Sequence, residues 1–260
     1  YKRQDKVFQQ SIVNTFLYLI IQVPIMLVLA ILLAQLLNNK DLKFRGFFRT
    51  CVFLPCATSL VSYSLIFRSM FATDGLINSI LIKLGILSTG YNFLGNSTSA
   101  KIVIIIALIW RWTGYNMVFY LAGLQNIEYS VYEAAKIDGA GHMKIFTNIT
   151  LPLGKPILVT MGLFSALGYW NDWTNGLYYL SGNEGQKLYS IQNLLNQMIT
   201  DIQYLASGKV TGNIGAEVAK LPTTSIRMAI AFIAMLPLFI IYPFLQKYFA
   251  EGITLGAVKG

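Results

Sequence analysis

Long apolar runs alternate with short polar segments along this chain of 260 residues. The first run extends from Ile12 to Leu37 and holds no charged side chain. The later runs are Thr50 to Phe67, Ile102 through Leu124, Ile157 to Trp170, and Met228 to Leu245. A bilayer core about 30 Å thick needs roughly 20 helical residues, and lipid offers the backbone no hydrogen-bond partners. Since the alternating pattern of a barrel is absent, we predict an all-α polytopic membrane protein with about five transmembrane helices, forming a single domain of residues 1–260.

Two segments between the apolar runs have a helical periodicity of their own. Residues 74–85, DGLINSILIKLG, are expected to form a short interfacial helix that ends at glycine. Residues 188–206 place five apolar side chains on one helix face. These are Ile191, Leu194, Leu195, Met198 and Ile202. This amphipathic helix either covers the helical bundle or docks an external partner, and the pattern favours neither.

Residues 133–152, EAAKIDGAGHMKIFTNITLP, form a charged, glycine-containing segment between two apolar runs. Glu128 to Ile137 favours a helix, and Gly139 and Gly141 permit a tight turn after it. A second short helix is expected next, ended by Pro152 and Pro156.

The second short helix has three apolar residues at spacings of three, Met143, Phe146 and Ile149, which we expect on one side. An exposed Met and Phe on a surface helix fit a groove in another protein. A mere connector is the alternative, but roughly thirty residues is long for a bundle loop, which usually needs two to eight.

The charged residues are few and lie mostly between the apolar runs. Apolar residues make up 55% of the chain and charged residues 12%, against about 25% charged in soluble domains. The net charge is +9, and the basic residues gather in the loops between the apolar runs. This is the pattern that orients membrane proteins, so nucleic acid is not expected as a partner. The cluster Lys40, Lys43, Arg45 and Arg49 is expected in the cytoplasm.

Alternation of the helices from that basic cluster predicts the sides of the other segments. Residues 39–49, the loop 125–155 and the tail 246–260 are expected in the cytoplasm. Residues 1–11, 73–100 and the loop 179–224 are expected outside the cell. An outside start without a signal peptide also predicts at least one further helix upstream.

Residue types that carry catalysis or bind metal are sparse. Cys51 and Cys56 are expected to be small packing residues, and His142 has no ligand cluster around it. Neither GK pair, at 154–155 and 208–209, is followed by Ser or Thr, so the chain has no phosphate-binding loop for ATP. We therefore expect no catalytic residue, no bound metal and no cofactor.

Two other classes remain as alternatives. An ion-coupled secondary transporter needs carboxylates inside its helices, and only Asp172 lies near one. A membrane glycosyltransferase needs paired acids or a metal cluster in a surface loop. The acids of the outer loop, Glu184, Asp201 and Glu217, are scattered instead.

The spacing in residues 133–152 resembles the EAA coupling loop of permease subunits of ABC importers, in particular those for carbohydrate uptake. The matching positions are Glu133-Ala134-Ala135, Gly139, Ile149 and Leu151-Pro152. Residues 92–96 and 110–127 look like one permease partner of sugar importers. Residues 168–173 and the ending 252–260 look like the other partner, so the chain combines motifs of both.

The resemblance implies a permease subunit of an ATP-driven, binding-protein-dependent sugar or oligosaccharide importer in the bacterial cell membrane. It implies as partners a second permease subunit, two ATP-binding subunits that use ATP and Mg²⁺, an extracellular solute-binding protein, and membrane lipid. The residues implied in ATPase coupling are Glu133, Ala134, Ala135, Asp138, Gly139, Ala140, Phe146, Ile149, Leu151 and Pro152.

The third apolar run offers candidates for a sugar path, because sugars stack on aromatic faces and bind polar donors. The candidates are Arg111, Trp112, Tyr115, Asn116 and Phe119. Trp112, Tyr115 and Phe119 share one helix face, and the alternative is that they form an interfacial aromatic belt, as Trp and Tyr commonly do. Arg111 is expected to face the bundle or a wet cavity. The segment Trp170, Asn171, Asp172 and Trp173 is a candidate contact for the binding protein.

Overall fold

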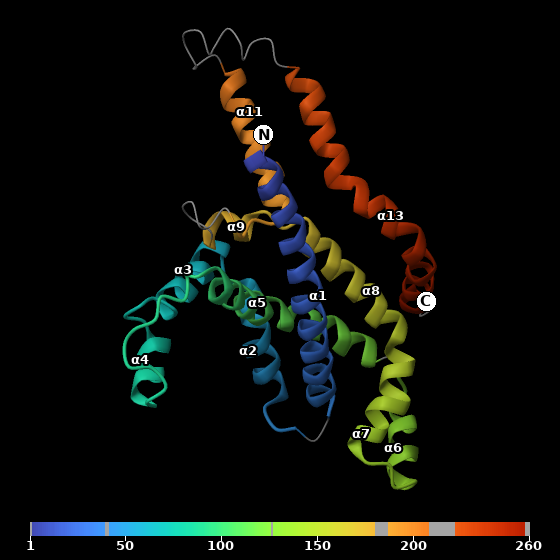
Figure 1. Ribbon diagram of the computed structural model, residues 1–260. Coiled ribbons are helices and arrows are strands. Elements are labelled where there is room, and N and C mark those ends of the chain that lie inside the picture. The colour runs from blue at the N-terminus through green and yellow to red at the C-terminus, as the bar shows by residue number, and fades with distance from the viewer. Residues whose placement is uncertain (1, 40–41, 126, 180–186, 208–221, 258–260) are drawn as a thin grey trace, which may run out of the picture. The chain divides into compact units, whose positions relative to one another are not determined.

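The computed structural model describes residues 2–39, 42–125, 127–179, 187–207 and 222–257, and these contain helices joined by turns and no strand (Figure 1). Lys40 of the basic cluster and the last three residues of the expected tail lie outside the described residues. The helices occur in this order along the chain: α1 (Lys2–Asn38), α2 (Arg45–Ala57), α3 (Leu60–Met70), α4 (Leu76–Lys83), α5 (Ser97–Leu124), α6 (Tyr129–Ile137), α7 (His142–Ile145), the π-helical turn η1 (Phe146–Thr150), α8 (Leu151–Trp170), α9 (Thr174–Tyr179), α11 (Ile191–Ala206) and α13 (Thr223–Ala257).

Four helical stretches among the described residues are long and apolar enough to cross a membrane. They are Lys6–Asn38, Ser97–Leu124, Met143–Trp170 and Thr223–Ile240. A fifth span is present if the bent pair α2 and α3 counts as one. The all-α polytopic prediction is confirmed, and the short helix expected at residues 74–85 is present as α4.

The apolar run Thr50 to Phe67 is not the straight helix that its composition predicts. It divides into α2 and α3, which are bent by 97°. Thr58 and Ser59 have extended backbone between the two helices, and the Ser59 hydroxyl accepts from the Ser62 N–H to cap α3. Such a cap replaces hydrogen bonds that a continuous helix would make. The hydrophobicity of a run therefore predicts its length, but not whether the helix within it bends.

The last helix is also longer than expected. α13 continues to Ala257, so most of the tail predicted at 246–260 is a continuation of the helix. Pro237 and Pro243 lie inside α13, and proline is tolerated within such long apolar helices.

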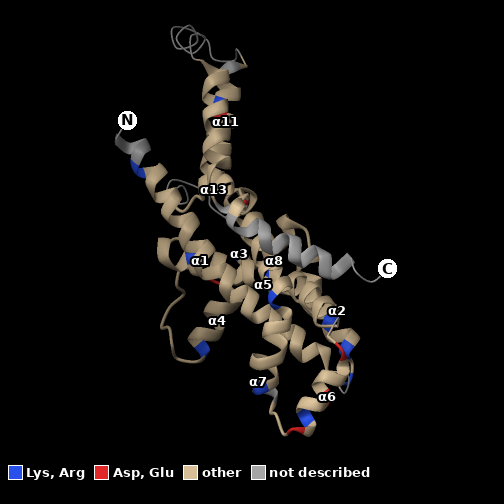
Figure 2. Ribbon diagram, turned by 90° about the vertical axis from the view of Figure 1, so that its right-hand side faces the viewer, with Lys and Arg blue, Asp and Glu red and all other residues tan. Residues whose placement is uncertain are grey.

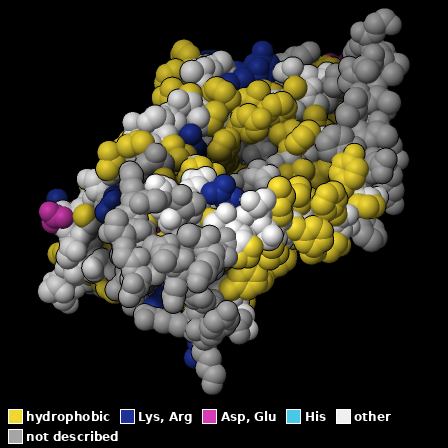
Figure 3. All heavy atoms as spheres, turned by 90° about the horizontal axis from the view of Figure 1, so that it is seen from above, with side chains coloured by type: hydrophobic (Ala, Val, Ile, Leu, Met, Phe, Trp, Pro, Cys, Tyr) yellow, Lys and Arg dark blue, Asp and Glu magenta, His cyan; other side chains and the backbone are white. Residues whose placement is uncertain are grey.

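Charged and apolar side chains are distributed as a bilayer requires. Figure 2 shows the charged residues mainly near helix ends and in turns, while the long ribbons are mostly without charge. Large hydrophobic side chains are exposed along the spans, among them Val13, Ile20, Leu36, Phe164 and Phe239. Figure 3 shows many hydrophobic side chains on the visible face. In water such a surface would be unfavourable, whereas lipid or other apolar helices can cover it.

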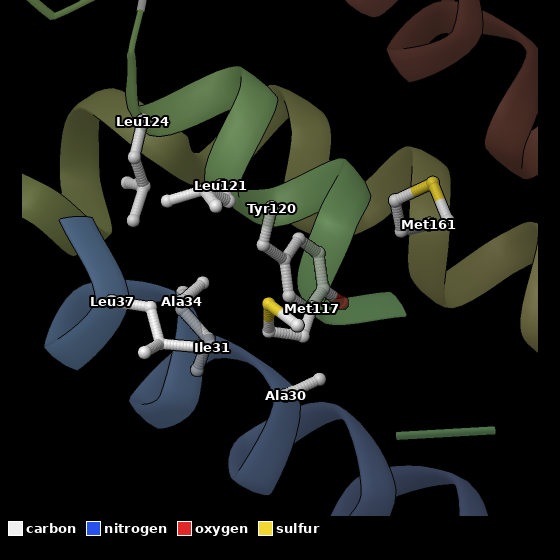
Figure 4. Close-up of a cluster of buried hydrophobic side chains, with 9 residues drawn as sticks. All are labelled: Ala30, Ile31, Ala34, Leu37, Met117, Tyr120, Leu121, Leu124 and Met161. Atoms are coloured by element: carbon white, nitrogen blue, oxygen red, sulfur yellow. The ribbon is translucent and has the colours of Figure 1, made fainter. Parts of the chain in front are cut away.

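The contacts divide the chain into two units, and the larger contains residues 18–166 and 245–260. Its main core lies between α1 and α5, where side chains of the two helices face each other, and Met161 of α8 adds to it (Figure 4). The buried members are Ala30, Ile31, Ala34, Leu37, Met117, Tyr120, Leu121, Leu124 and Met161. The small residues Ala30 and Ala34 let the helices approach, as is usual where lipid gives no hydrophobic driving force.

The other unit contains residues 1–17 and 167–244. Trp170, Ile191, Leu195 and Ile230 form its core. Asn14 Nδ2 donates to the Lys187 carbonyl at 2.8 Å, and the Ile191 N–H donates to the Thr15 hydroxyl at 2.8 Å. The helix expected at 188–206 is thus present as α11, anchored at its start to α1. Met198, which was expected on the apolar face of this helix, is exposed.

Candidate functional site

The turn after α6 has the backbone that its glycines predict. Gly139 has φ 73°, in the left-handed region that favours glycine. The N–H groups of Asp138, Gly139 and Ala140 donate to the carbonyls of Ala134, Lys136 and Ala135. The last carbonyls of α6 are therefore satisfied within the turn, in the manner of a glycine-ended helix. α7 begins two residues later, at His142.

The outer face of this turn is exposed, and its inner face has a small core. Glu133, Ala134 and Asp138 are exposed, and two apolar side chains lie open beside them, Ile137 at 86% and Met143 at 70% exposed. The core contains Tyr132, Ala135 and Ile145, with Ile127, Ala140 and Ile149 packed around it. A short helical turn with a small core of its own thus presents charged, small and apolar groups together.

Two expectations for the second short helix are wrong. It does not end at Pro152 or Pro156, because helical structure continues from Met143 to Trp170. Instead the chain widens into η1 just before Pro152. Proline lacks an N–H and its ring crowds the carbonyl four residues earlier, and a π-helical turn is a known way for a helix to accommodate such a disruption.

The second wrong expectation concerns Phe146, which does not lie on the exposed face where it was expected. Its side chain is half-buried and packs against the core of α1 and α5, whereas Met143 points to solvent. The expected common exposed face of Met143, Phe146 and Ile149 is therefore absent, because i to i+5 bonding changes the angle between successive side chains. Of the other coupling candidates, Leu151 is half-buried and Pro152 is exposed.

Three aromatic side chains form a ladder on one face of α5. The ring centroids of Trp112 and Tyr115 are 5.7 Å apart, and those of Tyr115 and Phe119 are 4.9 Å apart. All three side chains are exposed to a similar degree, between 36% and 40%. The structure therefore brings these three candidates together, as their spacing predicts.

The other two α5 candidates lie on buried faces. Asn116 donates to the Trp112 carbonyl at 3.0 Å and accepts from the Ser165 hydroxyl at 2.8 Å, which ties α5 to α8. Arg111 is 7% exposed, and its Nη1 donates to the Thr58 carbonyl at 2.9 Å. Its guanidinium also lies over the Tyr63 ring, 4.5 Å from the centroid. Arg111 therefore faces the bundle, and it caps α2 at the bend before α3.

The segment after α8 is a hydrogen-bonded corner. Trp170 is buried, and its Nε1 donates to the Ala234 carbonyl at 3.0 Å. The Asp172 carboxylate accepts from the N–H groups of Thr174 and Asn175 and so caps α9. Asn171 and Trp173 are exposed. Among the four candidates for binding-protein contact, only Asn171 and Trp173 present open side chains.

One contact at the bend was not predicted. A Cβ added to Gly114 would lie 1.9 Å from the Val52 carbonyl oxygen, so α2 and α5 approach through their backbones. Gly114 and Arg111 are three residues apart, on one face of α5. The glycine within an apolar run was the only signal of this contact in the sequence.

In the part of the chain that the structure describes, no group of three or more His, Cys, Asp or Glu is placed to hold a metal.

The fold and the exposed turn define a class, the polytopic helical membrane proteins with a polar segment that projects between two spans. Residues 6–255 match the family described as the inner membrane component of binding-protein-dependent transport systems, and the chain belongs to this family.

Two curated relatives differ in how they match. The chain is 49% identical to the lactose transport system permease protein LacF of Rhizobium radiobacter over 164 residues, which covers 63% of this chain and 55% of LacF. It is 30% identical to the polygalacturonan/rhamnogalacturonan transport system permease protein YtcP of Bacillus subtilis over 260 residues, which covers 98% of this chain and 78% of YtcP. This chain thus spans little more than half of LacF.

Solved structures agree on the fold. A crystal structure of a bacterial ABC transporter involved in the import of the acidic polysaccharide alginate matches with a TM-score of 0.72 and 22% identity, covering 93% of this chain and 79% of that chain. At this identity the likeness is one of fold.

Proposed function

We propose that this chain is a permease subunit of an ATP-driven, binding-protein-dependent importer of sugars or oligosaccharides. Membership of the family and relatives named for lactose and for polygalacturonan support this function. In this proposal the chain forms half of a translocation path with a second permease subunit. Two separate ATP-binding subunits use ATP and Mg²⁺, and an extracellular solute-binding protein delivers the sugar at a bacterial cell membrane.

The exposed turn between α6 and α7 carries the proposal, as the part that docks on an ATP-binding subunit. It presents Glu133, Ala134 and Asp138 beside the apolar Ile137 and Met143, a mixture that suits the rim and centre of a protein interface. Nothing lies within 4 Å of a Cβ added to Gly139, so the turn has free space around this residue and can enter a groove on a partner. Residues 125–155 would then be cytoplasmic and residues 179–224 extracellular.

The experiment uses the complete complex reconstituted in liposomes, with Gly139→Leu in this subunit. A leucine here obstructs the docking groove, so we expect loss of ATP-dependent uptake and release or uncoupling of the ATP-binding subunits. Glu133→Lys should weaken assembly by reversing an exposed charge. Both variants should still insert, because no span is altered.

Gly85 supplies a matched control for this test. It too has φ 73° and open space around a Cβ, but it follows α4, in the segment assigned to the opposite side of the membrane. Gly85→Leu therefore causes the same backbone strain without touching the docking surface. Wild-type uptake and full retention of the ATP-binding subunits in Gly139→Leu would refute the docking role.

The aromatic ladder of α5 is the proposed contact with sugar. Partly exposed aromatic rings suit the C–H surfaces of a sugar. Trp112, Tyr115 and Phe119 supply three such rings in a row, packed edge-on or tilted against one another. Tyr115→Ala or Phe119→Ala should weaken uptake roughly ten- to hundredfold, from a loss of about 1–3 kcal/mol, without releasing the ATP-binding subunits. Ile106→Ala, at a similarly exposed position on α5, is the control. Equal uptake in all three variants would assign the rings to packing or lipid.

A further inference from the structure

Basic and aromatic side chains alternate where α2 begins. The set, here called the basic–aromatic patch, is Lys43, Phe44, Arg45, Phe47, Phe48 and Arg49. The end of α1 and the start of α2 lie side by side, and Arg49 Nη2 donates to the Leu37 carbonyl at 2.8 Å (Figure 1). α1 contains one candidate span, and α2 with α3 forms the bent one. The patch therefore lies at one end of two spans, where lipid headgroups meet the hydrocarbon.

The aromatic side chains of the patch are open. Phe44 is 79% exposed, Phe47 66% and Phe48 44%. Leu54, two helical turns after Phe47 and on the same face of α2, is 59% exposed. The exposed face of α2 therefore continues from the rings into the apolar part of the span, which lipid chains can cover.

The backbone of Phe44 is strained. Its φ is 57° and its ψ is 26°, and no other residue except glycine has a positive φ among those that the structure describes. The left-handed region is unfavourable for a bulky side chain. Since the ring is mostly exposed, packing within the chain compensates little of this strain. Strained residues cluster at ligand contacts, so a contact with another molecule is the compensation that we infer.

The charges of the patch lack acidic partners within the described chain. Neither Lys43 nor Arg45 makes a hydrogen bond or an ion pair to another described residue. Arg49 uses Nη2 for the Leu37 carbonyl, and its buried Nε has no partner among those residues. Arg45 and Arg49 are four residues apart on one side of α2, where two like charges repel each other. A bound anion would remove this repulsion.

The sequence around the patch offers almost no carboxylate. Between Asp5 and Asp74 the only acidic residue is Asp41, which lies outside the described residues. One carboxylate cannot neutralise three basic side chains. Guanidinium groups form paired hydrogen bonds with phosphate oxygens, so two arginines on one side of a helix suit a phosphate group.

We propose that the basic–aromatic patch binds an anionic phospholipid, with Arg45 and Arg49 on the headgroup phosphate and Phe44 and Phe47 against the acyl chains. A free phosphate would use the arginines alone and leave the rings exposed. Basic residues next to a span recognise anionic lipid, and the rings continue into a surface that lipid covers. This binding does not depend on the transport function proposed above.

The test measures lipid binding to the purified full chain by native mass spectrometry in detergent. Phosphatidylglycerol is compared with phosphatidylcholine of the same acyl chains, and inorganic phosphate is added as a competitor. We expect phosphatidylglycerol to bind about tenfold more tightly or better, because each basic residue near anionic lipid contributes about fivefold, or about 1 kcal/mol. Inorganic phosphate should not displace the lipid.

Arg45→Gln should weaken the binding of phosphatidylglycerol about fivefold and leave that of phosphatidylcholine unchanged. Because Arg45 makes no bond to a described residue, the unfolding temperature in lipid-free detergent should stay the same. Arg68→Gln is the matched control. Arg68 is an exposed arginine in the last turn of α3, at the other end of the same bent pair, and its removal should keep the wild-type affinity.

Phe44→Gly separates a ligand contact from a structural role. Glycine adopts the left-handed backbone without strain, so this variant should unfold at a higher temperature in lipid-free detergent. It should also bind phosphatidylglycerol more weakly, because the ring is lost. Phe44→Trp keeps an aromatic side chain and should keep the affinity.

Four results would overturn the lipid site. They are equal affinity for the two lipids, equal losses in Arg45→Gln and Arg68→Gln, displacement of the lipid by inorganic phosphate, and binding to the isolated chain that disappears in the assembled complex. The last result would assign the patch to a partner subunit. Gly139→Leu should bind phosphatidylglycerol as wild type does, so the lipid site and the docking turn can fail separately.

Discussion

Gly114 and Gly139 are both glycines of the larger unit, but they are required for opposite reasons. At Gly114 the backbone of α5 approaches the Val52 carbonyl so closely that a Cβ would overlap it. At Gly139 no atom lies within 4 Å of an added Cβ, and the constraint is the positive φ of the turn. One glycine allows two helices to touch, and the other allows a turn to project.

The surroundings of the two glycines differ in the same way. Beside Gly114, the buried Arg111 caps α2 and lies over Tyr63, so a backbone contact and a cation fix the bend. Beside Gly139, Ile137 and Met143 are exposed, and the core beneath is small. Substitutions at a tightly packed contact between helices lower stability, whereas substitutions in an exposed turn affect stability little and act mainly on the binding of a partner. Substitutions should therefore separate folding from docking.

Gly114→Ala should have the largest effect on stability. The new methyl group would overlap the Val52 carbonyl oxygen, and backbone atoms cannot move aside as a flexible side chain can. We expect a destabilisation of about 3 kcal/mol, seen as a lower unfolding temperature and a lower yield of monodisperse protein in detergent. Gly46→Ala on α2 has open space and should behave as wild type. Equal stability of the two variants would mean that α2 and α5 do not touch here.

Arg111→Gln should have the next largest effect. It removes the charged donor to the Thr58 carbonyl and the contact with Tyr63, for a loss of about 2 kcal/mol. Arg111→Lys keeps the charge without the planar fork and should recover part of the loss.

Cys56, half-buried two residues before Thr58, reports on the bend. In a Cys51→Ser background, a loosened bend should speed modification of Cys56 by a thiol reagent. If Arg111→Gln changes neither stability nor this rate, the guanidinium does not hold the bend.

Sequence predicts the open turn better than it predicts the packed joint. The left-handed backbone at Gly139 is a local requirement, and it is predictable from the helix-favouring residues before it and the second glycine after it. The length of the spans is also predictable, because lipid forces long apolar runs to be helical. The contact of Gly114 with Val52 and the capping of Thr58 by Arg111 join residues 62 and 53 positions apart, so no local pattern reveals them.

The errors have local causes as well. The rule that proline ends a helix fails at Pro152 because the turn before it widens, and the same widening takes Phe146 off the exposed face. The apolar run Thr50 to Phe67 is divided by the cap that Ser59 forms and by the hydrogen bond from Arg111 to the Thr58 carbonyl. The hydrophobicity of the run predicts neither contact. Of the candidate site, sequence therefore predicted the turn and the aromatic ladder but not which coupling residues are open.

Gly139→Ala should have the smallest effect. Alanine causes no clash here, and the only cost is the left-handed backbone, about 1 kcal/mol. Gly85→Ala, with the same φ and the same open space, should cost as much. Unfolding temperatures of the four alanine variants should therefore fall in the order Gly46, then Gly85 and Gly139 together, then Gly114. If Gly139→Ala destabilised the protein as much as Gly114→Ala, the turn would be a packed element, and its exposed side chains would no longer mark a surface for a partner.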